Sequence, residues 1–65
     1  MPEGFSALTQ AQKKSYITSF LYHMSDLDDV SDWEPERVEG IGSDIVKVHF
    51  SDNRVYYYKN GAWDE

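Results

Sequence analysis

The sequence predicts an α+β fold, with one N-terminal helix packed on a three- to four-stranded antiparallel β-meander. Two patterns predict it. Apolar residues recur with helical spacing in the first third of the 65 residues, and β-branched and aromatic residues alternate between turn signals in the last third. A chain of this length has room for a single small domain. Residues 1–8 contain Pro2 and Gly4 without a regular pattern, so we expect them to form a loose terminus.

The helix is expected over residues 9–24. Thr9 and Gln12 have the three-residue spacing of a capping box, in which each side chain bonds the backbone N–H of the other residue. Four apolar residues follow at positions i, i+3, i+4 and i+7, which share one face of a helix. We expect this face to cover the sheet, and its members are Ile17, Phe20, Leu21 and Met24.

An acidic connection is expected over residues 25–36. Seven carboxylates lie within residues 26–39, where Arg37 is the single basic residue. They belong to Asp26, Asp28, Asp29, Asp32, Glu34, Glu36 and Glu39. We expect Ser25 to cap a short second turn of helix, because Ser is a favoured N-cap, and Pro35 to end any helix. Val30 and Trp33 are apolar anchors within this acidic stretch.

Residues 37–65 are expected to form the meander. Its strands are predicted at about residues 37–41, 45–50 and 55–58, where β-branched and aromatic residues are concentrated. Asn60-Gly61 predicts a tight hairpin, because a type I′ turn needs positive φ at both central positions. This hairpin pairs Tyr58 with Trp63 and adds a fourth, C-terminal strand.

The two faces of the sheet follow from the alternation of side chains along each strand. If Asp52 and Asn53 form the tip of the turn between the strands at 45–50 and 55–58, Phe50 lies opposite Val55 and Val48 lies opposite Tyr57. The residues expected under the helix are then Val46, Val48, Phe50, Val55 and Tyr57. The residues expected on the open face are Ile45, Lys47, His49, Tyr56, Tyr58 and Trp63.

Twelve acidic residues against six basic ones give a net charge of −6. This charge repels phosphate backbones and anionic membranes, so direct nucleic-acid binding is disfavoured and a basic protein partner is favoured. The chain has no cysteine, no signal peptide and no apolar run long enough to span a membrane, so we expect it in the cytoplasm. A short chain without disulfides often relies on oligomerisation, and we therefore expect a homodimer or another assembly.

We expect no catalytic site, no metal site and no cofactor. His23 has no neighbouring nucleophile and is placed on the helix surface, and His49 falls on the open sheet face. The acidic stretch lacks the glycine and the distal glutamate of an EF-hand loop. Gly40-Ile41-Gly42 lacks the third glycine and the helix of a phosphate-binding loop.

Two hypotheses of function follow. In the first, the chain is a non-enzymatic module that inhibits a basic, nucleic-acid-handling protein, with the acidic residues as the steering surface and Trp33 as the anchor. In the second, the chain is a structural or assembly protein that docks or self-associates through Tyr56, Tyr58 and Trp63, because such rings are enriched in interface hot spots.

Two resemblances are visible. Val48-His49-Phe50, a polar turn and Val55 to Tyr58 resemble the opening hairpin of KTSC-type domains, although the four residues that name those domains have no counterparts here. The short, acidic, cysteine-free and aromatic-rich chain also resembles early bacteriophage proteins, many of which inhibit host enzymes. The first hypothesis specifies an inhibitor that imitates nucleic acid because carboxylates spaced along a rigid surface can present charges as a nucleic-acid backbone does, and the likeness to bacteriophage proteins only adds to it.

Overall fold

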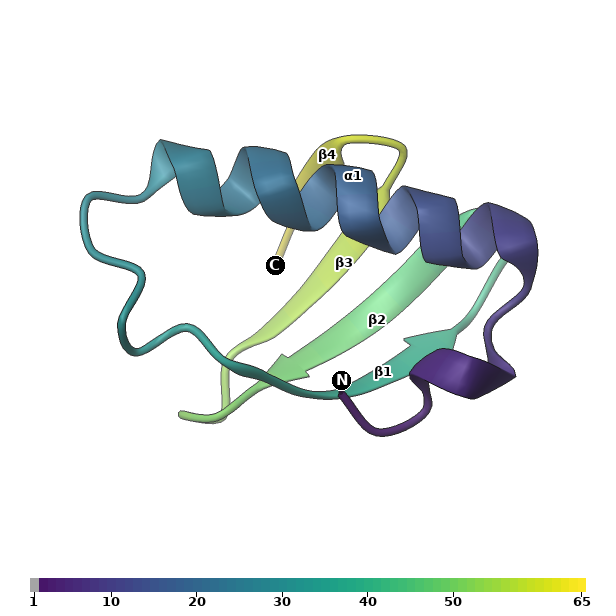
Figure 1. Cartoon of the computed structure of the whole chain (residues 1–65), viewed down its shortest axis with the longest axis horizontal. Helices are drawn as coiled ribbons and strands as arrows, with labels where there is room; N and C mark the ends of the chain where they lie inside the picture. The colour runs from purple at the N-terminus through teal and green to yellow at the C-terminus, as the bar shows by residue number, and fades with distance from the viewer. Residues whose placement is uncertain (1) are drawn as a thin grey trace.

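A computed structural model describes residues 2–65 and confirms the α+β arrangement, with one helix packed on a four-stranded antiparallel sheet (Figure 1). The strands lie side by side in chain order. The elements are η1 (Phe5–Ala7), α1 (Gln10–Asp26), β1 (Pro35–Gly40), β2 (Ile45–Phe50), β3 (Val55–Lys59) and β4 (Ala62–Asp64). Helix α1 crosses one face of the sheet, mainly over β2, β3 and β4. No helix among residues 2–65 has the length and apolar character needed to cross a membrane.

The start of α1 matches the predicted capping box. The Thr9 hydroxyl accepts a hydrogen bond from the Gln12 backbone N–H at 3.1 Å, and the Gln12 side chain accepts one from the Thr9 N–H at 2.9 Å. The helix ends at Asp26, two residues later than predicted, with Leu27 as its C-cap. Ser25 therefore lies inside α1 and caps no second turn.

The predicted buried face of α1 is wrong for two of its four residues, Ile17 and Leu21. Ile17 and Leu21 are 47% and 62% exposed, whereas Phe20 and Met24 are half-buried at the edge of the core. The face that packs on the sheet carries Ser15, Tyr16, Ser19 and His23. This face is largely polar, because its hydroxyl groups bond the loops at the ends of the strands and small serine side chains let the backbones approach.

The turn between β2 and β3 has three residues instead of a two-residue tip. The Phe50 carbonyl accepts from Asn53 N–H at 3.2 Å, and the Phe50 N–H donates to the Arg54 carbonyl at 2.8 Å. Asn53 has φ of 69°, the left-handed conformation that such three-residue turns require. Phe50 thus lies opposite Arg54, and His49 lies opposite Val55.

This one-residue shift exchanges the two faces of β3, because side chains alternate along a strand. Val48 pairs with Tyr56 and Val46 pairs with Tyr58. Tyr57 is 39% exposed on the outer face, so its predicted place in the core is wrong. The buried apolar residues are Leu8, Tyr16, Val38, Val46, Val48, Phe50 and Tyr58.

Residues 2–8 are bonded to the sheet and do not form the loose terminus expected for residues 1–8, of which Met1 lies outside the described residues. The Glu3 N–H donates to the Glu36 carbonyl at 2.9 Å, and the Val38 N–H donates to the Glu3 carbonyl at 2.8 Å. Gly4 has φ of 90° and lies directly against the Val38 carbonyl, where a Cβ atom would not fit. Leu8 then enters the core.

Strand β1 begins at Pro35, earlier than predicted, and ends at Gly40.

Candidate protein-binding surface

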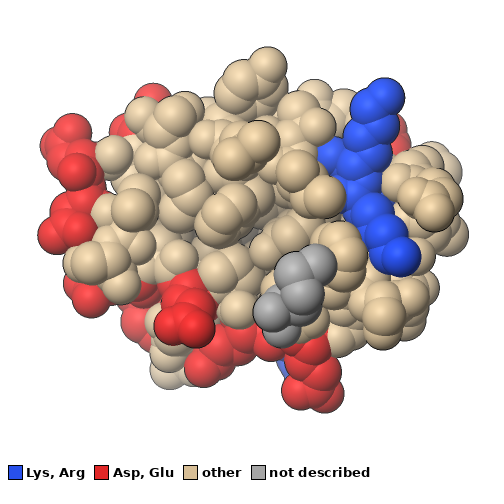
Figure 2. Space-filling model, viewed as in Figure 1, with Lys and Arg blue, Asp and Glu red and all other residues tan. Residues whose placement is uncertain are grey.

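The acidic residues of the 26–36 stretch are all exposed, and all but Glu36 lie at the end of the molecule where α1 stops or on the segment that follows it. Acidic side chains gather at this end in Figure 2, over the C-terminal turn of α1 and the segment that follows it. Asp26 closes the helix and Glu36 lies in β1. The remaining residues of the predicted site here are Asp28, Asp29, Asp32 and Glu34, on the irregular segment between the two elements. Glu39 instead faces Arg37 and His49 on the outer side of the sheet.

Trp33 fixes this acidic segment to the domain. Its ring lies 5.2 Å from the His23 ring and 5.3 Å from the Phe50 ring, in edge-to-face contacts. The Arg54 guanidinium lies 3.9 Å from the Trp33 ring centre on a cation–π contact. The half-buried ring therefore anchors its own chain. This corrects the expectation that Trp33 serves as an anchor for a partner.

Backbone bonds order the segment on both sides of Trp33. The Trp33 N–H donates to the Val30 carbonyl at 3.0 Å, and the Ser51 N–H donates to the Glu34 carbonyl at 3.0 Å. Asp29 accepts a hydrogen bond from the Ser31 N–H at 3.0 Å, which holds the pKa of Asp29 below its usual value. Val30 is 46% exposed, so this side chain is the apolar contact that the acidic surface presents.

Tyr56, Tyr58 and Trp63 lie beneath α1, whereas the sequence placed them on the open face. Tyr58 is fully buried, and Tyr56 and Trp63 are half-buried against the core. The cause is the three-residue turn, which moves alternate residues of β3 to the helix side. The β3–β4 pairing itself matches the prediction, because Tyr58 pairs with Trp63 and Asn60 and Gly61 both have positive φ. These rings are not available as an exposed docking surface.

His23 is the centre of this aromatic cluster, so its predicted place on the surface is wrong. Its ring is 1% exposed and lies 4.5 Å from the Tyr56 ring and 5.1 Å from the Trp63 ring. His23 Nδ1 lies 2.7 Å from the Tyr58 hydroxyl. Burial lowers the pKa of His23 and raises the pKa of Tyr58, so both groups are held neutral and one hydrogen bond joins them, with the imidazole tautomer setting which group donates. The sequence signal for the face of α1 that packs on the sheet was the four-residue spacing of Ser15, Ser19 and His23.

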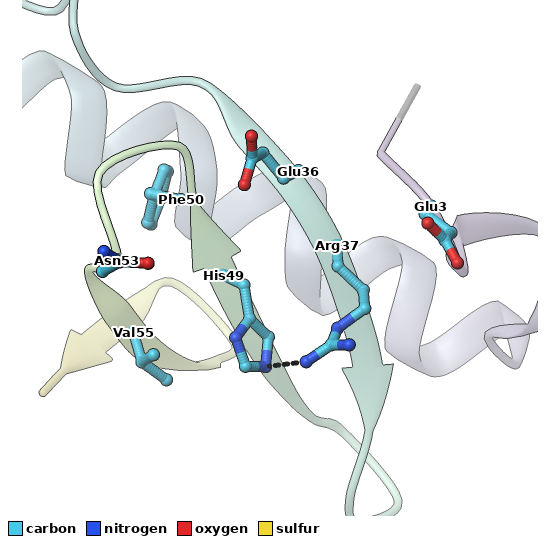
Figure 3. Close-up of a pocket in the computed structure, with 7 residues that line it drawn as sticks. All are labelled: Glu3, Glu36, Arg37, His49, Phe50, Asn53 and Val55. Carbon is cyan, nitrogen blue, oxygen red and sulfur yellow. Dashed lines mark hydrogen bonds between the residues drawn. The ribbon is translucent and has the colours of Figure 1, made fainter.

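The outer face of the sheet carries an open hollow of about 520 Å³ (Figure 3). An Arg37 N–H donates to His49 Nε2 at 3.2 Å, and the same nitrogen lies 3.3 Å from a Glu39 carboxylate oxygen. The hollow is lined by Glu3, Glu36, Arg37, His49, Phe50, Asn53 and Val55. Within residues 2–65, no three His, Cys, Asp or Glu side chains converge as metal ligands would.

No protein-family model, curated protein or solved structure matches this chain.

Proposed function

We propose that this protein is a non-enzymatic binding module whose acidic end docks on a basic protein. One observation carries the proposal: the carboxylates at the end of α1 are exposed, yet the segment that holds them is ordered by Trp33 and by backbone bonds. A fixed array of charges loses little conformational entropy on binding, which favours affinity as well as steering. Val30 adds an exposed apolar contact inside the array.

The partner that suits this surface is a nucleic-acid-handling protein with a basic cleft. Such a cleft attracts a row of negative charges whether phosphates or carboxylates supply them. The net charge of −6 keeps the module itself from binding nucleic acid. Occupying the cleft would block the enzyme, so the proposed activity is inhibition by imitation of nucleic acid.

The test compares capture of proteins from a bacterial lysate by three tagged variants at low and high salt. Wild type is set against Asp32→Asn/Glu34→Gln, which removes two exposed charges from the acidic end. The control is Gln10→Lys/Ser43→Lys, which changes net charge by the same amount at exposed positions elsewhere. A charge-driven contact weakens with salt because exposed charges are screened beyond about 10 Å at 0.1 M.

The proposal predicts a basic nucleic-acid-handling partner that wild type and the control retain at low salt and lose at high salt. The Asp32→Asn/Glu34→Gln variant should lose it under both conditions, and the purified partner's activity should fall on addition of wild type. A partner retained equally by all three variants, or one that survives high salt, would contradict the proposal.

A further inference from the structure

Helix α1 carries an apolar stripe whose outer members, Ile17 and Leu21, the fold leaves outside the core. Ile17, Phe20, Leu21 and Met24 are spaced as one helical face, but the sheet contacts the neighbouring face that contains Ser15, Ser19 and His23. Ile17 is 47% exposed and Leu21 is 62% exposed, and Phe20 and Met24 extend the stripe down to the edge of the core. This four-residue stripe has the pattern of a helix face that packs on another helix.

The charges at the two ends of α1 oppose its dipole. Lys13 and Lys14 lie near the N-terminus, where the dipole is positive, and the first turn holds no acidic residue. Asp28 and Asp29 follow directly after the C-cap, where the dipole is negative. Figure 2 shows acidic side chains at one end of this face and basic side chains toward the other, with mostly uncharged side chains between them.

We propose that a second copy of this chain binds the four-residue stripe, with the two α1 helices antiparallel about a two-fold axis. An axis placed between Phe20 and Leu21 sets each of them opposite the other in the partner copy. The same axis sets Ile17 opposite Met24, so the four apolar positions meet in pairs. The stripe is therefore complementary to itself.

The charges select this occupant and this orientation. In the antiparallel pair, Lys13 of one copy falls opposite Asp28 of the other, with Lys14 and Asp29 beside them, and the two helix dipoles also oppose each other. Charges that are unfavourable within one chain thus become favourable between two chains. A parallel pair would place lysines against lysines and carboxylates against carboxylates, which is repulsive. Asp28 and Asp29 also belong to the acidic end used in the proposed function, so in the dimer that function falls to Asp32 and Glu34, on the later part of the acidic segment.

Sedimentation equilibrium of the purified chain tests the proposal over about 1 μM to about 1 mM, a range that spans weak and moderate association. Wild type should approach twice its mass of 7.6 kDa as concentration rises. Leu21→Glu should remain a monomer. Tyr57→Glu is the matched control, because it places the same charge at an exposed apolar residue on the outer sheet face, and it should dimerise like wild type.

Charge exchange then tests the orientation at low salt. Lys13→Glu/Lys14→Glu and Asp28→Lys/Asp29→Lys should each be monomeric alone, form a mixed dimer when combined, and form a homodimer again when all four changes are in one chain. Circular dichroism confirms that each variant keeps its helix. Three results would overturn the proposal. They are a wild type that stays monomeric up to about 1 mM, a dimer that survives Leu21→Glu, and a variant with all four charge changes that does not form a homodimer.

Discussion

Ser15→Ala is the sharpest test of how α1 is held on the sheet. The Ser15 side chain is fully buried, and its hydroxyl donates to the Asp44 carbonyl at 2.6 Å. The same oxygen accepts from the Asn60 N–H at 2.8 Å. One hydroxyl group therefore joins the helix to the loop before β2 and to the turn between β3 and β4. Ser19 makes a similar link one helical turn later, because its hydroxyl accepts a hydrogen bond from the Gly61 N–H at 2.8 Å.

The expected loss follows from the two groups that the substitution leaves unpaired. A buried N–H or C=O without a partner raises the free energy of the folded state by about 1–3 kcal/mol. Alanine recovers at most about 0.5 kcal/mol through its higher helix propensity. Because Asn60 lies at an exposed turn that water can reach, each of the two groups costs about 1 kcal/mol, and Ser15→Ala should lower the free energy of unfolding by about 1.5–2 kcal/mol.

Urea titration followed by tryptophan fluorescence measures this loss. A domain of this size has a total stability of about 3–10 kcal/mol, so a fall of about 2 kcal/mol moves the midpoint by about 1–2 M. Two controls share the helix. Leu21→Ala and Ser25→Ala alter exposed side chains, and each should stay within about 0.5 kcal/mol of wild type at low protein concentration. If Leu21→Ala destabilised the chain as much as Ser15→Ala, the helix face described above would be incorrect.

Two further predictions concern His23 and the last hairpin. Burial lowers the pKa of His23 below its ordinary value of 6.5, with a partial offset from the Asp26 carboxylate. The unfolded chain therefore takes up this proton first as pH falls, and the free energy of unfolding should decrease as pH drops below about 6.5. His23→Gln should flatten this dependence of the unfolding free energy on pH, and His49→Gln should not. The measurement is urea titration at a series of pH values, and a wild-type unfolding free energy that does not change with pH would contradict the prediction. Gly61→Ala should lower stability by about 1–2 kcal/mol in the same titrations, because φ is 95° and an added Cβ would lie 3.1 Å from the Tyr22 ring. Asn60→Gly, which suits the same turn, should be tolerated, and equal stability of the two variants would refute the turn assignment.

Local signals in the sequence were sufficient for the elements and their order. The Thr9 capping box, the span of β2 and the Asn60-Gly61 turn depend on neighbouring residues alone, and each matches the structure. These signals led to the helix on a four-stranded antiparallel sheet. The N-terminal segment was missed because its bonds to Glu36 and Val38 join residues far apart in the sequence.

The faces of the sheet depended on a single residue in one turn. Both a two-residue turn and a three-residue turn fit the polar stretch between Phe50 and Val55, and Asn53 is suited to positive φ in either. The structure has the three-residue turn, so Tyr56 and Tyr58 move under the helix while Tyr57 moves out. The error in the candidate site came from this register, since the composition of β3 gives no preference for one face over the other.

The error in the helix face has a different origin and connects to the proposed dimer. Hydrophobic periodicity assigns the most apolar stripe to the core, and here the core side of α1 is chosen by hydrogen bonds from Ser15, Ser19 and His23. Two independent patterns, the stripe of Ile17 and Leu21 and the charge order along α1, are then unfavourable in a single chain. Both become favourable when a second helix lies antiparallel on the first. The periodicity therefore identified a surface suited to burial, and the proposed antiparallel dimer would place that surface between two copies of the chain.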